Sequence, residues 1–102
     1  MRKGEWTFLT NHARVLAYIA KHPQATAQEI AQEARLSIRA VQNIITDLGN
    51  GGYITKRKEG RRNQYTVYAD QPMRHPLERG HSVGEGLAIR YSPPEEEANA
   101  VK

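Results

Sequence analysis

Apolar residues recur every three to four positions in three successive stretches of the first half of the chain, which is the spacing of amphipathic helices. The first stretch runs from about Asn11 to Lys21, with Thr10 or Asn11 as its N-cap. This helix is expected to end at His22, because Pro23 disfavours the helical conformation of the residue before it. Its apolar face consists of Val15, Leu16, Ile19 and Ala20.

Two further helices follow, and each has its own start signal. Thr26 with Glu29 three residues later fits a capping box, and this second helix is expected to end near Ala34. Ser37 is the expected N-cap of the third helix, which the glycine-rich run 49–52 should end. The inward-facing residues of the third helix are Val41, Ile44, Ile45 and Leu48.

The next two segments, residues 53–58 and 63–68, are rich in β-branched and aromatic residues, which is typical of strands. The short link 59–62 predicts a hairpin between them, with Gly60 supplying a positive φ at its tip. The order helix, helix, helix, hairpin predicts a mainly α fold with a small β-hairpin (α+β). We expect a winged helix-turn-helix, with a three-helix core and a two-stranded wing.

The pattern weakens after the hairpin, and we divide the chain into a domain of residues 1–70 and a C-terminal extension of residues 71–102. Prolines and glycines break up any long helix in the extension, although residues 83–89 fit one short helical turn or a strand. We expect the extension to be partly ordered to about residue 89 and disordered after it, where two prolines and three glutamates follow.

Charge is distributed unevenly over the 102 residues, whose net charge is +4. Residues 1–68 hold 11 Lys and Arg against 5 Asp and Glu, whereas residues 69–102 hold 4 against 6. The basic part therefore favours a polyanionic partner. The chain has no cysteine, which excludes a disulfide scaffold, a cysteine zinc site and a thiol nucleophile. It has no apolar run long enough for a membrane span or a signal peptide, so we expect a cytoplasmic protein without membrane contact.

The connection between the second and third helices contains only Arg35 and Leu36 before the cap Ser37. So short a link is typical of a helix-turn-helix, in which Leu36 packs into the junction and the second helix of the unit can enter a DNA major groove. Ser37 lies at the helix N-terminus, which suits a phosphate. The outward-facing residues, whose side chains can bond or touch base edges, are Ile38, Arg39, Gln42, Asn43 and Thr46.

The hairpin carries five positive charges and one negative charge within residues 56–62. Such a tip can contact the minor groove or the DNA backbone, although a basic hairpin alone is often only a solvated loop. The four histidines lack the helical spacing of a metal site, and we find no nucleophile with a neighbouring base and no phosphate-binding glycine loop. We therefore expect no enzyme, no metal and no cofactor.

The capping box at Thr26, the pair Leu36-Ser37, the Gly52-Tyr53-Ile54 entry to the wing and the run 60–65 at its tip together resemble the winged helix-turn-helix of the MarR and ArsR families. The resemblance covers residues 10–68 and implies a prokaryotic transcriptional regulator, usually a homodimer on a pseudo-palindromic site. The recognition role then falls on the outward-facing residues of the third helix. The wing role falls on Arg57, Lys58, Arg61 and Arg62.

Our hypothesis is a sequence-specific regulator that binds double-stranded DNA, with the recognition helix at about residues 37–49 and the wing at residues 56–62. Two alternatives remain. A winged helix can serve as a protein-interaction module that does not bind DNA, since a fold does not fix a function. A repressor that responds to a small molecule is the other, although the segments flanking the domain are short and no cysteine-bearing metal motif is present.

Overall fold

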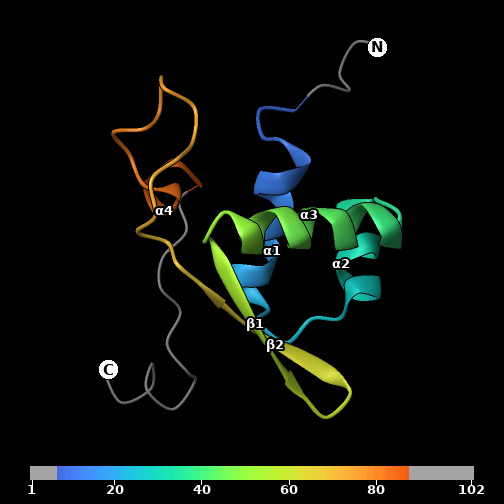
Figure 1. The fold of residues 1–102 in the computed structure, drawn as a ribbon. Helices are drawn as coiled ribbons and strands as arrows, with labels where there is room; N and C mark the ends of the chain where they lie inside the picture. Colours follow the sequence, from blue (N-terminus) through green and yellow to red (C-terminus); the bar gives the residue numbers. More distant parts are fainter. Residues whose placement is uncertain (1–6, 88–102) are drawn as a thin grey trace, which may run out of the picture.

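The three expected helices and the hairpin appear in the expected order in the computed structural model, which describes residues 7–87 (Figure 1). α3 lies across α1 and α2, and the hairpin extends from the end of α3 past the other end of α1. None of the helices within residues 7–87 is long and apolar enough to cross a membrane. The elements are α1 (Asn11–Lys21), α2 (Ala27–Ala34), α3 (Ile38–Asn50), β1 (Ile54–Glu59), β2 (Arg62–Val67) and α4 (Val83–Leu87).

Hydroxyl side chains start the first three helices, as predicted. Thr10, rather than Asn11, caps α1 by accepting a bond of 3.1 Å from the Ala13 N–H. Both bonds of the capping box at α2 are present, because Thr26 Oγ1 accepts from the Glu29 N–H and Glu29 Oε1 accepts from the Thr26 N–H. Ser37 caps α3. Each such cap contributes about 1 kcal/mol to helix stability.

The turn between α2 and α3 depends on a left-handed residue. Arg35 has φ 60° and ψ 47°, a conformation that costs a non-glycine residue roughly 1–2 kcal/mol. This conformation lets the Leu36 N–H reach back to the Ala31 carbonyl at 2.9 Å, and the half-buried Leu36 side chain packs on the core as expected. The chain can therefore begin α3 immediately after the Ser37 cap, which sets the helix-turn-helix geometry.

The glycine-rich run ends α3 one residue later than predicted, because Gly49 still lies within the helix. The Gly51 N–H continues the helical pattern by donating to the Asp47 carbonyl at 2.9 Å. The chain reverses only at Gly52, whose φ of 85° is accessible to glycine without a steric cost. Tyr53 then turns inward and is buried at the start of the hairpin.

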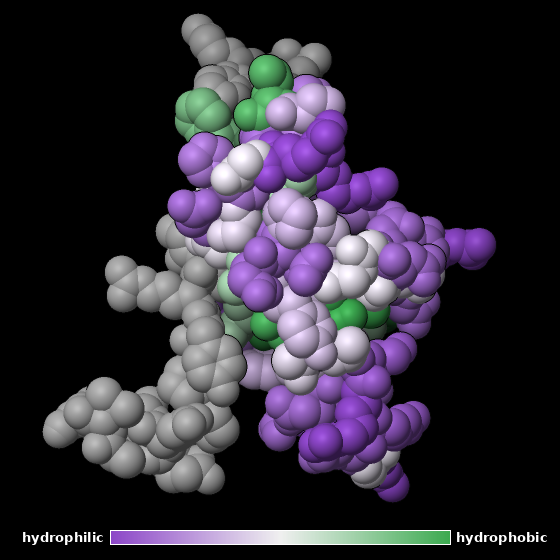
Figure 2. Space-filling model, turned by 60° about the vertical axis from the view of Figure 1, so that its left-hand side comes forward, coloured by the Kyte–Doolittle hydropathy of each residue, from purple (hydrophilic) through white to green (hydrophobic). Residues whose placement is uncertain are grey.

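β1 and β2 pair antiparallel, with Ile54 opposite Val67 and Glu59 opposite Arg62. Each strand is shifted by one residue from the prediction, so that only Gly60 and Arg61 form the turn. Gly60 has the expected positive φ, at 64°, and a glycine at the first position of a two-residue turn suits the twist of a hairpin. The surface of this projecting wing is mostly hydrophilic (Figure 2).

The segment after the hairpin folds back onto the body of the protein. The Tyr53 hydroxyl donates to the Pro72 carbonyl at 2.6 Å, and Pro72 forms a bridge with Ser82. Val83, in the short helix α4, is 7% exposed and joins the core. Residues 71–87 thus pack on the helix-turn-helix domain, while the expected disorder beyond residue 89 lies outside the described residues. The core combines residues from all three main helices, both strands and α4, among them Val15, Ile19, Ile30, Val41, Ile54, Tyr65 and Val83.

Candidate DNA-binding interface

α3 has one buried and one exposed face, as the sequence predicts. Its inner residues, spaced three to four apart, are at most 8% exposed and pack against α1, α2 and the hairpin. All of the outward-facing residues that the sequence singled out are exposed in the structure. They are Ser37, Ile38, Arg39, Gln42, Asn43 and Thr46.

Several side chains on this face remain available for a ligand. Arg39, Gln42 and Asn43 make no side-chain hydrogen bond or ion pair to any other part of residues 7–87. Thr46 Oγ1 donates to the Gln42 carbonyl at 3.0 Å, which leaves its methyl group exposed beside the helix. Ile38 is 45% exposed and adds an apolar side chain to this face. The face combines bidentate donors with apolar groups, the chemistry that base edges require.

Asp47 is the one carboxylate in α3, and the structure gives it a partner outside the helix. The Nε2 atom of His12 in α1 lies 2.8 Å from Asp47 Oδ2, and both side chains are about half exposed. The contact ties the start of α1 to the last turns of α3. It also gives a partner to the acidic group of α3, which would otherwise repel a phosphate.

The basic residues of β1 lie on two different faces of the wing, because alternate residues of a strand point to opposite sides. Lys56 and Lys58 share a face with their cross-strand partners Tyr65 and Asn63, whereas Arg57 lies on the other face. Arg57 forms an ion pair with Glu59 on that same face. Thus Arg57 and Lys58, which the sequence assigned together to DNA, do not share a surface, while Lys56 joins Lys58. Strand alternation was the signal that could have identified Lys56.

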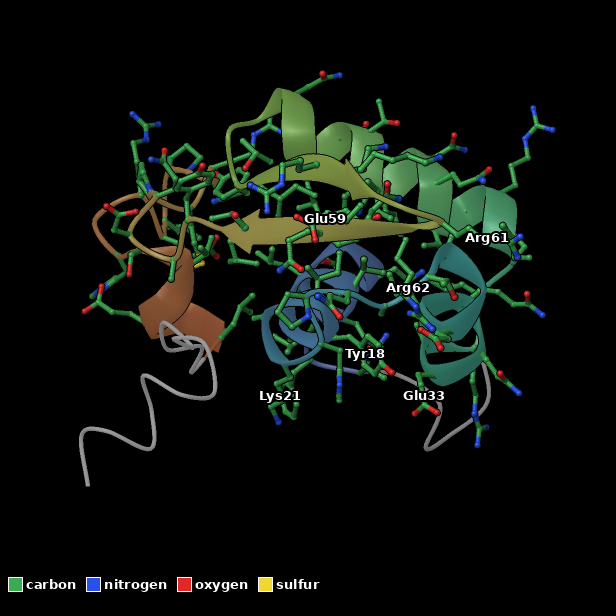
Figure 3. The ribbon with its side chains drawn as sticks, turned by 90° about the horizontal axis from the view of Figure 1, so that it is seen from below. Tyr18, Lys21, Glu33, Glu59, Arg61 and Arg62 are labelled. Carbon is green, nitrogen blue, oxygen red and sulfur yellow. The ribbon has the colours of Figure 1, made fainter. Side chains whose placement is uncertain are left out.

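The two arginines at the end of the wing also differ. Arg61, in the turn, is exposed and has no ion pair or hydrogen bond with its side chain anywhere in the described part of the chain. Arg62 points from β2 towards α2 (Figure 3). Its Nη1 donates to the Gln24 carbonyl at 2.7 Å and lies 3.3 Å from Glu29 Oε1, and its Nη2 lies 3.4 Å from Glu29 Oε2. The structure therefore engages Arg62 within the protein.

Further bonds join β2 to the segment that precedes α2. The Tyr65 N–H donates to the Pro23 carbonyl at 2.8 Å, and the Gln24 amide donates to Gln64 Oε1 at 2.8 Å. The sequence gave no indication of these contacts, because their partners lie about 40 residues apart. Glu29 was identified only as a helix cap, although it also holds Arg62.

Two pKa shifts accompany these contacts. The backbone N–H of Thr26, followed by the Arg62 guanidinium, lowers the pKa of the Glu29 carboxyl below its ordinary value of 4.5. Glu29 is therefore ionised at neutral pH, as both of its contacts require. Burial raises the pKa of the Tyr65 phenol, an effect that the side chain of Asn63 partly offsets. Tyr65 is thus a neutral member of the core.

A shallow groove of about 240 Å³ lies between α1 and α2, below the size range of roughly 300–1,000 Å³ that is usual for ligand pockets. Its labelled lining residues Tyr18, Lys21 and Glu33 lie on the side opposite to the wing strands (Figure 3). Within residues 7–87, no three His, Cys, Asp or Glu side chains are grouped so that they could hold a metal ion.

Comparison with known proteins bears on the family and the fold of this chain. A sequence model of the MarR family matches residues 7–62. A solved structure of MepR, a transcription regulator of the Staphylococcus aureus multidrug efflux pump MepA, has 14% sequence identity and a TM-score of 0.56, over 90% of this chain and 70% of that chain. The zinc-responsive MarR family member ZitR of Lactococcus lactis has 16% identity and a TM-score of 0.48, over 65% of this chain. No curated protein matches.

The chain spans 47% of the length of ZitR and 70% of that of MepR. At 14% identity the MepR structure establishes the fold alone, and it agrees with a winged-helix architecture for this chain. The matching proteins are transcription regulators rather than enzymes. Since the family match covers more than half of the chain, this protein belongs to the MarR family of winged-helix DNA-binding transcription regulators.

Proposed function

We propose that this chain binds double-stranded DNA in a sequence-specific manner and thereby regulates transcription. The observation that carries the proposal is the outer face of α3, where Arg39, Gln42 and Asn43 are exposed and unpaired within the described residues. The same face exposes Ile38, so it combines bidentate donors with an apolar side chain. A major groove is about 12 Å wide, admits a single helix, and presents the matching acceptors, donors and methyl groups.

Each residue assigned to the outer face of α3 has a role in this proposal. Arg39 donates two bonds to the O6 and N7 atoms of a guanine, and Gln42 or Asn43 pairs with the N6 and N7 atoms of an adenine. Ile38 and the methyl group of Thr46 contact thymine methyl groups. Ser37 and the free backbone N–H groups at the start of α3 bind a phosphate.

The wing supplies the contacts that do not depend on sequence. Lys58 and Arg61, together with Lys56 on the face of Lys58, bind phosphates or enter the minor groove next to the site of α3. Such contacts contribute most of the affinity and make it dependent on salt, whereas the base contacts of α3 contribute specificity. Arg57 and Arg62 were assigned the same role from the sequence, but both already have carboxylate partners.

We further propose that the protein acts as a homodimer in the cytoplasm, where the DNA of a prokaryote is accessible. A dimer places two recognition helices on half-sites that are one helical turn apart, about 34–36 Å. The exposed apolar residues Leu9 and Leu77 favour such an association, since they are 42% and 84% exposed. Their segments both lie at the end of the molecule away from the wing tip (Figure 1), so pairing there would leave both wings free for DNA.

The test is selection of bound sequences from a random duplex pool, followed by fluorescence anisotropy with the selected duplex over a range of salt concentrations. We expect a two-fold repeated motif, whose spacing gives the dimer geometry. The double variant Lys58→Ala/Arg61→Ala should bind all duplexes more weakly, and the slope of log K against log salt should become shallower by about 4, because the dimer loses two phosphate contacts in each protomer.

A matched control removes the same charge elsewhere. Lys21 and Arg79 are exposed, and Lys21 lies on the side opposite to the wing strands (Figure 3), so the variant Lys21→Ala/Arg79→Ala should leave the salt slope nearly unchanged. If the wild-type protein fails to bind any duplex at low salt, the proposal is wrong and the interaction-module alternative gains support. If both double variants behave alike, the assignment of the wing fails.

A further inference from the structure

The base of the wing is held in the core by Ile54 and Tyr65, whereas the part nearer the tip is joined to the segment before α2 by a row of polar contacts. Between Thr55 and Gln64 no residue of the hairpin is buried, and a two-stranded hairpin is at best marginally stable by itself. The outermost of the contacts is made by Arg62, next to the turn that carries Arg61. Whatever fixes Arg62 therefore also fixes the direction in which the wing tip projects.

We propose that Arg62 is a positioning residue, which holds the wing at a set angle to the helix-turn-helix by clamping β2 to Gln24 and Glu29, and does not itself bind phosphate. This inference rests on the proposed function in DNA binding. Arg62 is an arginine in a basic hairpin, which would otherwise suggest that it contacts DNA directly. The clamp consists of Arg62, the Gln24 carbonyl and the Glu29 carboxylate.

The geometry of the clamp requires the forked shape of a guanidinium. Nη1 of Arg62 serves both the Gln24 carbonyl, at 2.7 Å, and Glu29 Oε1, while Nη2 faces Glu29 Oε2. Two nitrogens fixed in one plane thus fix the direction of the side chain against two acceptors on different elements. A lysine ammonium carries the same charge on a single atom, so it cannot keep both acceptors in this arrangement.

Glu29 joins the clamp to the DNA-binding helices. Its Oε1 atom accepts a bond of 2.9 Å from the Thr26 N–H, so the carboxylate is held at the first turn of α2. α2 in turn is connected to α3 through the short turn at Arg35. The positions of α3 in the major groove and of the wing beside it are therefore linked through one carboxylate, which both caps α2 and binds β2.

Two further hydrogen bonds of β2 support this inference. The Tyr65 N–H donates to the Pro23 carbonyl, and the Gln24 amide donates to Gln64. Gln64 and Tyr65 follow Arg62 in the same strand. The clamp thus continues a ladder between β2 and the segment that precedes α2. Removing Arg62 would free the tip first, because within residues 7–87 no other hydrogen bond or ion pair joins the tip to the helices.

The experiment uses two conservative variants of the full chain whose effects on DNA binding differ between the two possible roles. Arg62→Lys keeps the positive charge but loses the fork. Glu29→Gln keeps the capping box, which glutamine can also form, but removes the negative charge that faces Arg62. Glu33→Gln is the matched control, because it makes the same charge change one turn later on α2, on the side away from the wing (Figure 3).

If Arg62 positions the wing, Arg62→Lys and Glu29→Gln should each weaken binding to the selected duplex by about twofold to fivefold, the range for losing one exposed ion pair. The salt slope should stay close to that of the wild type, because no phosphate contact is lost. Glu33→Gln should bind as well as the wild type or slightly more tightly. If Arg62 instead binds phosphate, Arg62→Lys should bind nearly as the wild type, and Glu29→Gln should bind more tightly because Arg62 is released; either result overturns the inference.

A second measurement without DNA separates this inference from the proposed function. Hydrogen exchange of the Tyr65 amide, which bonds the Pro23 carbonyl, should become faster in Arg62→Lys and Glu29→Gln but not in Glu33→Gln. Exchange in the middle of α3 should stay the same in all three variants, which shows that they are folded. Unchanged exchange at Tyr65 would refute the clamp. Failure of the wild type to bind any duplex would refute the proposed function, whatever the exchange data show.

Discussion

The outer face of α3 and the wing are both polar surfaces that the sequence assigns to DNA, yet they differ in how many of the assigned side chains already have partners within the protein. On α3 every assigned residue is exposed, and the long side chains of Arg39 and Gln42 have no partner within the described chain. In the wing, two of the four assigned residues already form ion pairs, Arg57 with Glu59 and Arg62 with Glu29. Only half of the assigned cations of the wing are therefore free to meet a polyanion.

The difference follows from the physics of the two elements. A helix anchored by an apolar face determines by rotation alone which residues point outward, so the buried Val41 and Leu48 define the opposite side. In the hairpin no residue is buried between positions 55 and 64, so no apolar face there determines which side chains point to solvent. The charges of the hairpin are free to pair with carboxylates that the hairpin or the neighbouring helix supplies. Charge density thus locates a basic surface, but it does not show which cations are available.

The largest expected effect tests whether stability resides in α3 rather than in the wing. Ile44, on the inner face of α3, is 6% exposed, and Ile44→Ala should lower the free energy of unfolding by about 2–5 kcal/mol through lost burial and a cavity. Arg61→Ala in the exposed turn should change it by no more than about 0.5 kcal/mol. Urea denaturation with an unchanged m-value measures both. Equal losses in the two variants would contradict the comparison.

Much of the helical core could be predicted from the sequence because its signals are local. A cap and its acceptor lie three residues apart, as at Thr26 and Glu29, and the apolar period marks the buried face. The boundaries of α3 and of the strands were each displaced by one residue. Glycine permits both continuation and reversal of the chain, so the run 49–52 does not indicate by itself that the reversal occurs at Gly52.

The wing could be predicted only in part. Its strands and Gly60 follow from composition and turn chemistry, and alternation would have separated Arg57 from the lysines on either side. The partner of Arg62 could not be found in this way, since Glu29 lies 33 residues earlier and meets it only after the chain has folded. No single-sequence pattern distinguishes an arginine that contacts DNA from one that is held by a helix cap.

The next effect in size concerns DNA and separates the two surfaces by the kind of loss they cause. Arg39→Ala should remove about 1–3 kcal/mol of discrimination at one base pair of each half-site, because a bidentate contact to guanine is lost. Binding to duplexes that already lack that base should change little. Lys58→Ala should instead weaken binding to every duplex by a similar factor. Affinities for a set of singly substituted duplexes measure both patterns, and a uniform loss in Arg39→Ala would contradict the assignment of α3.

The smallest expected effect is a loss of stability at low pH, when the Glu29 carboxylate that binds the wing becomes protonated. The pKa of Glu29 is lowered in the folded protein by the Thr26 N–H and by Arg62, so folding favours the ionised carboxylate. The resulting stabilisation is fully present above the ordinary pKa of 4.5 and is lost as the pH falls through the lower pKa of the folded state. The residues of α3 assigned to DNA include no carboxylate, so their side chains keep the same charge in this range.

We therefore expect the difference in stability between the wild type and Glu29→Gln to be constant from pH 7 to about pH 5, where the carboxylate remains ionised in both states, and to shrink towards zero at lower pH. Thermal unfolding of the two proteins over this range measures the difference, with Glu33→Gln as the control for general charge effects. In parallel, exchange of the Tyr65 amide should accelerate in acid relative to the intrinsic rate, whereas amides of α3 should keep their protection. A difference that persists below the carboxylate range would show that the charge of Glu29 is not its source, and the wing would then be held by the ladder at Pro23 and Gln24 without the ion pair.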